Sequence, residues 1–241
     1  MCYIIGAICR QYGYGAVLSE NVKRGTFMAI RRNYKSQAVK MTELAILTAV
    51  VFILQWFGIA IRLPFLGTTI NLVLVPIVLG ATVLGPWAGA WLGFVNGLQV
   101  YLFLGVLGGD PFFTVILFNN NPVITFFICV VKTTLAGFLC GLVYDLLSKK
   151  NEIVAMFVAA MLVPIVNTGV FILGCLTIFD TIKDNFVGDG GSVVYFLFIG
   201  VAGINFLCEF TVNAIFAPAL NRLTVILNKQ LGVSNRKPKK S

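Results

Sequence analysis

Six apolar runs, most of them close to 20 residues long, constrain what this 241-residue chain can fold into. A run of about 20 apolar residues can cross the hydrocarbon core of a bilayer as a helix, which satisfies its own backbone hydrogen bonds. Only 11% of the residues are charged, whereas an average soluble domain has roughly 25%. The sequence therefore predicts an all-α integral membrane protein, a six-transmembrane-helix bundle. The predicted spans are about 42–61, 70–84, 87–106, 122–145, 153–179 and 193–220.

Positive charge is distributed unevenly over the loops that join the predicted spans. Basic residues cluster in the amino-terminal segment, the 148–152 loop and the carboxyl-terminal tail, whereas the loops on the opposite side contain only Arg62 and Lys183. Lys and Arg are enriched in the cytoplasmic loops of membrane proteins. With an even number of spans both termini lie on one side, so we expect both to be cytoplasmic. The basic excess then reflects membrane orientation, and we expect no nucleic acid among the partners.

The same pattern divides the chain into three parts. We expect a basic cytoplasmic lead-in over residues 1–40, a six-helix transmembrane domain over 41–227 and a basic cytoplasmic tail over 228–241. Met28 and Met41 are alternative starting methionines, so the lead-in could result from a misassigned start.

Two local features refine the predicted spans. Pro76 lies inside the second span and is expected to kink it, because proline removes a helical hydrogen bond. Residues 107–121 contain the sequence Gly-Gly-Asp-Pro and are expected to form a long, partly apolar loop.

Small residues recur at helical spacing in two spans. Ala45 and Ala49 lie four residues apart in the first, and Gly89, Gly93 and Gly97 form a ladder with the same spacing in the third. Small residues at this spacing let a second helix approach closely. We expect the glycine ladder to contact another helix of the bundle.

One lysine lies well inside the fourth apolar run. Lys132 is ten residues after Pro122, which places it about 15 Å below the outer end of that helix. A lysine near the bilayer centre costs about 2.5–3.5 kcal/mol on insertion scales and usually marks a functional site. Such an ammonium favours an anionic partner.

Three asparagines reach a similar depth in neighbouring spans: Asn96, Asn167 and Asn205. Polar groups at this depth must bond within the protein or line a cavity. Together with Lys132 they predict a pocket open to the outside, in which asparagine amides meet amide or hydroxyl groups of a ligand. The predicted outer loops with Arg62 and with Asn119, Asn120 and Asn121 lie above this level and could close the pocket.

Lys132 has a structural alternative. Glu209 follows Asn205 by four residues on the same face of the sixth predicted helix, and Asn213 lies one turn further. By residue counting Glu209 is about 9 Å deeper than Lys132, a gap that a lysine side chain could partly cover. The sequence leaves open whether Lys132 pairs with Glu209 and whether these three side chains bond only between helices.

The sequence lacks the signatures of several enzyme classes. It contains no histidine and no Walker A, HExxH, GxSxG or DDxxD pattern. Its six cysteines include no CxxC pair, and four lie in apolar runs, so we expect neither a disulfide framework nor a metal site. We expect a protein that is not an enzyme, with no cofactor. A membrane-embedded enzyme of lipid or isoprenoid metabolism and a structural membrane subunit remain the alternatives.

Taken together, the order and spacing of these features resemble a known family, the substrate-binding S components of energy-coupling factor (ECF) vitamin transporters. The resemblance covers about 41–227. It rests on Ala45 and Ala49, the run 70–76 followed by 84–86 and Gly89, Asn121-Pro122 before the span with Lys132, and the series Asn205, Glu209 and Asn213.

The resemblance implies a mechanism and partners. Such an S component captures a vitamin or related micronutrient from outside the cell, as part of an ABC importer in the prokaryotic cytoplasmic membrane. It then associates with a membrane coupling subunit (EcfT-like) and two cytoplasmic ATPases, which drive delivery inward. Ala45 and Ala49 would contact the coupling subunit. The substrate site would comprise Arg62, Asn119, Asn120, Asn121, Lys132, Asn167, Tyr195 and Asn205. Lys132 favours an acidic substrate such as pantothenate, folate, niacin or lipoate.

Overall fold

The computed structural model describes residues 37–58, 72–110, 113–188 and 191–230. Most of the predicted lead-in, the end of the predicted tail and the candidate site residue Arg62 lie outside these ranges. The chain divides into two compact units, Met1–Thr42 and Glu43–Ser241. The account that follows concerns the second unit.

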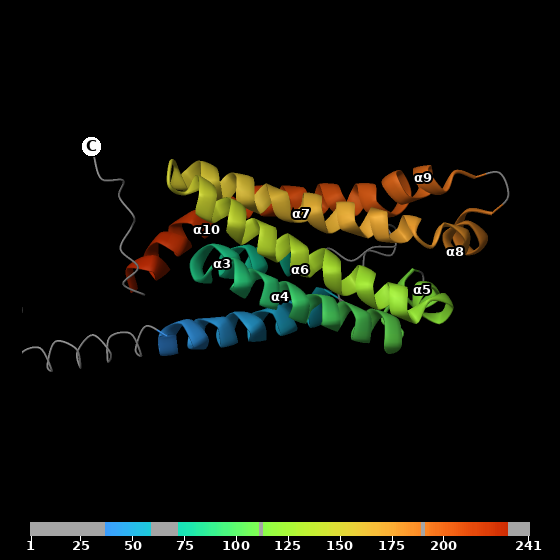
Figure 1. Ribbon diagram of the computed structural model, residues 1–241, viewed down its shortest axis with the longest axis horizontal. Helices are drawn as coiled ribbons and strands as arrows, with labels where there is room; N and C mark the ends of the chain where they lie inside the picture. The colour runs from blue at the N-terminus through green and yellow to red at the C-terminus, as the bar shows by residue number, and fades with distance from the viewer. Residues whose placement is uncertain (1–36, 59–71, 111–112, 189–190, 231–241) are drawn as a thin grey trace, which may run out of the picture. The chain divides into compact units, whose positions relative to one another are not determined.

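Every element in the described ranges is helical, which confirms the all-α prediction. The first helix, Gln37–Gly58, enters the second unit at Glu43. It is followed by α3 (Leu74–Leu84), α4 (Pro86–Gln99), the π-helical continuation η1 (Val100–Val106), α5 (Thr114–Asn120), α6 (Pro122–Leu147), α7 (Glu152–Leu176), α8 (Phe179–Ile182), η2 (Lys183–Val187), α9 (Val193–Tyr195), η3 (Phe196–Val201) and α10 (Ala202–Gln230) (Figure 1).

Five helical stretches of the described chain are long and apolar enough to cross a membrane. They are Gln37–Gly58, Pro86–Val106, Pro122–Leu147, Glu152–Leu176 and Val193–Leu227. The second predicted span, 70–84, corresponds to α3, whose 11 residues extend only about 16 Å. That is roughly half of the 30 Å hydrocarbon core, so the described residues support five spans of the predicted six.

Two local predictions are wrong. Pro76 occupies the first turn of α3, where a missing N–H breaks no helical hydrogen bond, so it does not kink a span. The predicted loop 107–121 contains the helix α5. The Asp110 carboxylate supports the start of that helix, since Oδ2 accepts hydrogen bonds from both the backbone N–H and the hydroxyl of Thr114.

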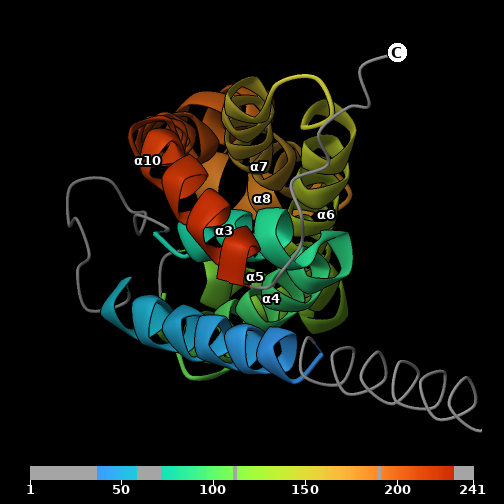
Figure 2. The same cartoon turned by 90° about the vertical axis from the view of Figure 1, so that its left-hand side faces the viewer.

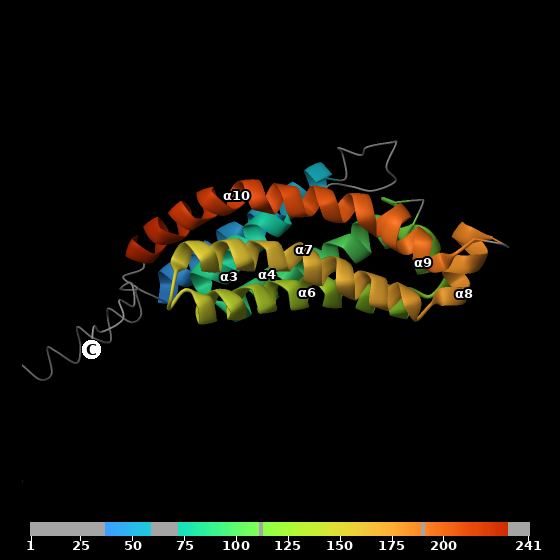
Figure 3. The same ribbon diagram turned by 90° about the horizontal axis from the view of Figure 1, so that it is seen from above.

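The helix α6 is central to the packing. It contacts α4 on one side and α7 on the other, and α10 packs against α7. The short helix α3 touches α4, α6, α7 and α10 and lies among them in the end-on view of Figure 2. α10 contains Pro218 and curves along its length (Figure 3), as helices do at an internal proline.

The glycine ladder forms the predicted close contact. A Cβ added to Gly97 would stand 2.6 Å from the carbonyl oxygen of Cys129 on α6, and Gly93 and Gly89 face Thr133 and Gly137 in the same way. Only glycine lets the two backbones approach this closely. The hydroxyl of Thr133 donates a 2.7 Å hydrogen bond to the Gly93 carbonyl and ties the helices together.

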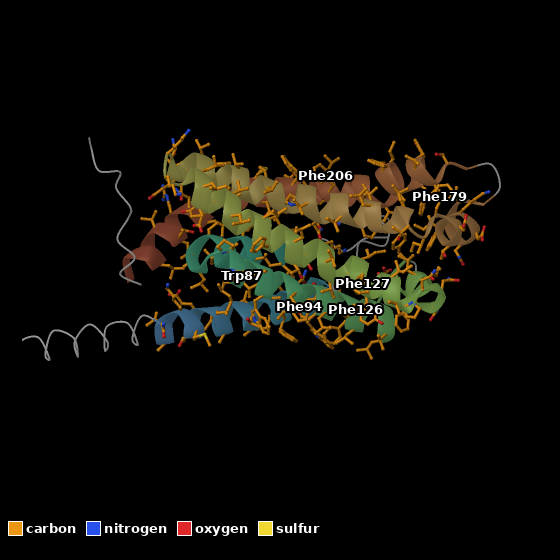
Figure 4. The ribbon with its side chains drawn as sticks, in the orientation of Figure 1. Trp87, Phe94, Phe126, Phe127, Phe179 and Phe206 are labelled. Carbon is orange, nitrogen blue, oxygen red and sulfur yellow. The ribbon has the colours of Figure 1, made fainter. Side chains whose placement is uncertain are left out.

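Large apolar side chains cover the outer faces of these helices. Trp87 on α4 is 80% exposed and Phe127 on α6 is 57% exposed, and Figure 4 labels both together with Phe94. A continuous apolar exterior of this kind suits contact with lipid and would be unusual on a soluble monomer.

Candidate functional site

A group of polar side chains separates two apolar clusters within the bundle. One cluster includes Met156 and Ala160 on α7, and the other includes Cys175 further along the same helix. Asn167 lies between them. We call the whole group the polar belt. Its members are Asn96, Gln99, Lys132, Asn167, Asn205, Glu209 and Asn213.

Glu209 is the centre of the polar belt. Its side chain is only 1% exposed, and each carboxylate oxygen accepts one amide N–H. Asn167 Nδ2 on α7 donates to Oε2 at 3.2 Å, and Asn205 Nδ2 on α10 donates to Oε1 at 3.0 Å. Asn213 Nδ2 donates to the backbone carbonyl of Glu209 at 3.0 Å. Of the three α10 residues, Glu209 is the one whose side chain bonds to another helix, whereas the bonds of Asn205 and Asn213 stay within α10.

Lys132 is half-buried, and its ammonium lies over the face of the Phe171 ring, 5.0 Å from the ring centroid. This is a cation–π contact. Within the described ranges Lys132 forms no hydrogen bond and no ion pair, so the direct pairing with Glu209 left open by the sequence is not observed.

The contacts that α7 makes with Lys132 and with Glu209 give the distance between these two residues along the helix axes. Lys132 lies beside Phe171, whereas Asn167, four residues before Phe171, bonds Glu209. Four helical residues correspond to about 6 Å, less than the 9 Å expected from residue counting. Asn205 precedes Glu209 by one turn on the antiparallel helix α10 and therefore lies close to the level of Phe171 and Lys132.

Asn96 and Gln99 bring two further buried amides to the polar belt from α4. Asn96 is 0% and Gln99 is 3% exposed, and none of their four side-chain N and O atoms has a hydrogen-bond partner in the described structure. Because Gly97 faces Cys129 and Val130, Asn96 lies within about 3 Å of the level of Lys132. Asn96 and Asn205 thus lie close to the level of Lys132, whereas Asn167 lies about one turn deeper.

The remaining predicted site residues are not joined to the polar belt. Asn119 and Asn120 are exposed at the end of α5, and Asn120 Nδ2 bonds the Ile116 carbonyl. Asn121 Nδ2 donates to the Thr181 hydroxyl at 3.0 Å, at the start of α6. Tyr195 on α9 is 65% exposed. Of the predicted site residues, the structure joins Asn167 and Asn205 through Glu209, and it leaves the loop residues apart from that group.

Two residues of this region, Phe171 and Gln99, were not among the site residues predicted from the sequence. Phe171 supports Lys132, and its spacing of four residues from Asn167 could have placed both on one helix face. Gln99 lies three residues after Asn96, a spacing that also shares a face.

Metal coordination has little support in the described ranges, where no group of three or more His, Cys, Asp or Glu side chains is close enough to hold an ion. The four described cysteines are free thiols.

Two comparisons with known proteins bear on this arrangement. A sequence model of the family described as "ECF transporter, substrate-specific component" matches residues 39–220. A search of curated proteins found no match. The family match covers the helices that carry the polar belt.

Proposed function

The chain belongs to the family of ECF transporter substrate-specific components, and from this premise we propose that it captures an acidic vitamin or related micronutrient from outside the cell. The family is a transporter component family rather than an enzyme family. The chain is accordingly a multi-pass membrane protein and the substrate-specific subunit of an ECF transporter.

The unpaired ammonium of Lys132 carries the proposal. Within the described ranges its contact is an aromatic ring, which attracts a cation but does not neutralise it. A cation held in a membrane span without a salt-bridge partner is costly, and a bound carboxylate would remove much of that cost. Phe171 holds the ammonium in place for such a ligand.

The neighbouring amides would bind the rest of the substrate. Asn96 and Gln99 are buried with no partner for either N–H or C=O, so they can both donate to and accept from a ligand. Groups of this kind orient a small molecule within an otherwise apolar site.

The proposed partners are an EcfT-like membrane coupling subunit and two cytoplasmic ATPases, in the cytoplasmic membrane of a prokaryote with both termini inside. Ala45 and Ala49 on the first helix are exposed and lie on one face. Small exposed residues at this spacing would let a helix of the coupling subunit approach closely.

A binding panel tests the proposal. Purified protein in micelles is titrated calorimetrically with pantothenate, folate, nicotinate and lipoate, and with nicotinamide and pantothenol as uncharged counterparts. We expect tight binding of an acid without chemical turnover, and at least tenfold weaker binding of its uncharged counterpart. Equal binding of acid and counterpart would contradict the role of Lys132, and turnover without partner proteins would contradict the transporter assignment.

A further inference from the structure

Two asparagines that bond Glu209 each have an amide oxygen without a hydrogen-bond partner. Asn167 and Asn205 each direct their Nδ2 toward the carboxylate. The other end of each amide, Oδ1, is buried and has no hydrogen-bond partner in the described structure. Both orphaned groups are therefore acceptors.

Glu209 determines this polarity. A carboxylate offers only acceptor oxygens, and an asparagine amide has its donors on one atom and its acceptor on the other. Reversing either amide would place its oxygen against a carboxylate oxygen, which is repulsive. Since the Glu209 side chain is almost fully buried, water cannot readily replace the amide N–H groups, and the two orientations are held.

The level of the two asparagines along the bundle relates their oxygens to the cation. Asn205 is close to the level of Phe171, over which the Lys132 ammonium lies, and Asn167 is one turn deeper on the same helix as Phe171. A ligand whose anionic group meets Lys132 thus extends next to acceptors. Buried acceptors without partners strongly favour a ligand that donates to them.

We propose that Glu209 is a specificity-determining residue: by orienting Asn167 and Asn205, it selects acids that also carry hydroxyl or amide N–H groups close to the carboxylate. The inference rests on the proposed function and narrows its substrate class. Acids without such donors can bind the Lys132 ammonium, but they leave the Oδ1 atoms of Asn167 and Asn205 without a hydrogen bond.

The test compares two classes of acid on three proteins. Pantothenate and folate carry a carboxylate together with N–H or O–H donors, whereas lipoate and nicotinate carry a carboxylate and no other donor. Their dissociation constants are measured by calorimetry on the wild type, on Glu209→Gln and on Glu152→Gln. Glu152 is exposed at the start of α7, so its variant is a matched control for the same chemical change.

We expect the wild type to bind a donor-bearing acid at least tenfold more tightly than either donor-free acid. In Glu209→Gln the glutamine N–H₂ requires an acceptor, so one asparagine amide reverses and offers the ligand a donor instead. The preference for donor-bearing acids should then fall at least tenfold. Donor-free acids should bind as well as before or better, because one of the two unpaired acceptors has been replaced by a donor. Glu152→Gln should keep the wild-type preference.

Two results would overturn the inference. One is equal affinity of the wild type for the two classes; the other is a Glu209→Gln variant that weakens both classes alike, as a purely structural defect would. The wild-type comparison needs no variant to fold, so equal affinity there would refute the inference by itself. Pantothenol separates the proposal of acid recognition from the proposal of donor preference. If pantothenol binds as tightly as pantothenate, acid recognition is refuted and the donor preference still stands.

Discussion

Replacing Gly93 by alanine should loosen the helix pair that carries Lys132. The added Cβ would overlap the Thr133 carbonyl group and stand 2.6 Å from its carbon and 2.9 Å from Thr134 Cα, all backbone atoms of α6. Ordinary contact begins near 3.4 Å, so α4 and α6 must separate by about 1 Å at this point. That separation also lengthens the hydrogen bond from the Thr133 hydroxyl to the Gly93 carbonyl, now 2.7 Å.

The expected loss of stability combines both effects. Overpacking costs about 1–3 kcal/mol and a weakened buried hydrogen bond about 1 kcal/mol, so the free energy of unfolding should fall by about 2–4 kcal/mol. Gly169→Ala is the matched control, because a Cβ at Gly169 has no heavy atom within 4 Å, and its stability should be unchanged or slightly higher. Both are measured by denaturant titration in mixed micelles, followed by circular dichroism. Equal stability of the two variants would refute the close α4–α6 contact.

Three further predictions concern other parts of the described chain. Replacing Ala45 and Ala49 together by leucine should leave substrate binding intact but abolish uptake and co-purification with the coupling subunit; lost binding would argue against an interface role. Asn151→Ala removes the side chain that caps α7 by accepting two backbone N–H groups and should lower the unfolding free energy by about 1 kcal/mol; unchanged thermal unfolding would show that the cap is dispensable. Thr133→Val keeps the side-chain volume and removes the donor to Gly93, so it should cost about 1 kcal/mol in the same micelle titration, and a neutral result would contradict the interhelical bond.

The long apolar spans were predictable because a bilayer imposes one length on every helix that crosses it. The predicted span 87–106 differs from Pro86–Val106 by one residue, and α7 begins one residue before its predicted start. The short helix α3 was not predictable in this way. Its apolar run 70–84 has the composition of a span, but the described helix begins only at Leu74.

The polar belt was predictable in depth but not in its bonding. Counting residues placed Lys132, Asn96, Asn167 and Asn205 at one level, since helical rise is constant. Their partners depend on helix rotation and register, which residue counts do not contain. This is why Glu209 was considered as a partner of Lys132, whereas its carboxylate binds two asparagine amides.

The helix α5 was missed for a local reason. Residues 108–111 have the composition of a turn, and turn signals usually predict a loop. The Asp110 side chain instead accepts two hydrogen bonds from Thr114, the first residue of the helix, although Asp110 is not its N-cap residue.

The most direct test of acid recognition is the affinity of Lys132→Met for the acidic substrate identified in the binding panel. Methionine keeps much of the side-chain length and its contact with Phe171 but removes the charge. We predict at least a tenfold loss of affinity, about 1.4 kcal/mol, with the unfolding temperature of the free protein unchanged or higher. An affinity equal to that of the wild type would contradict the central claim that Lys132 binds the anionic group of the substrate.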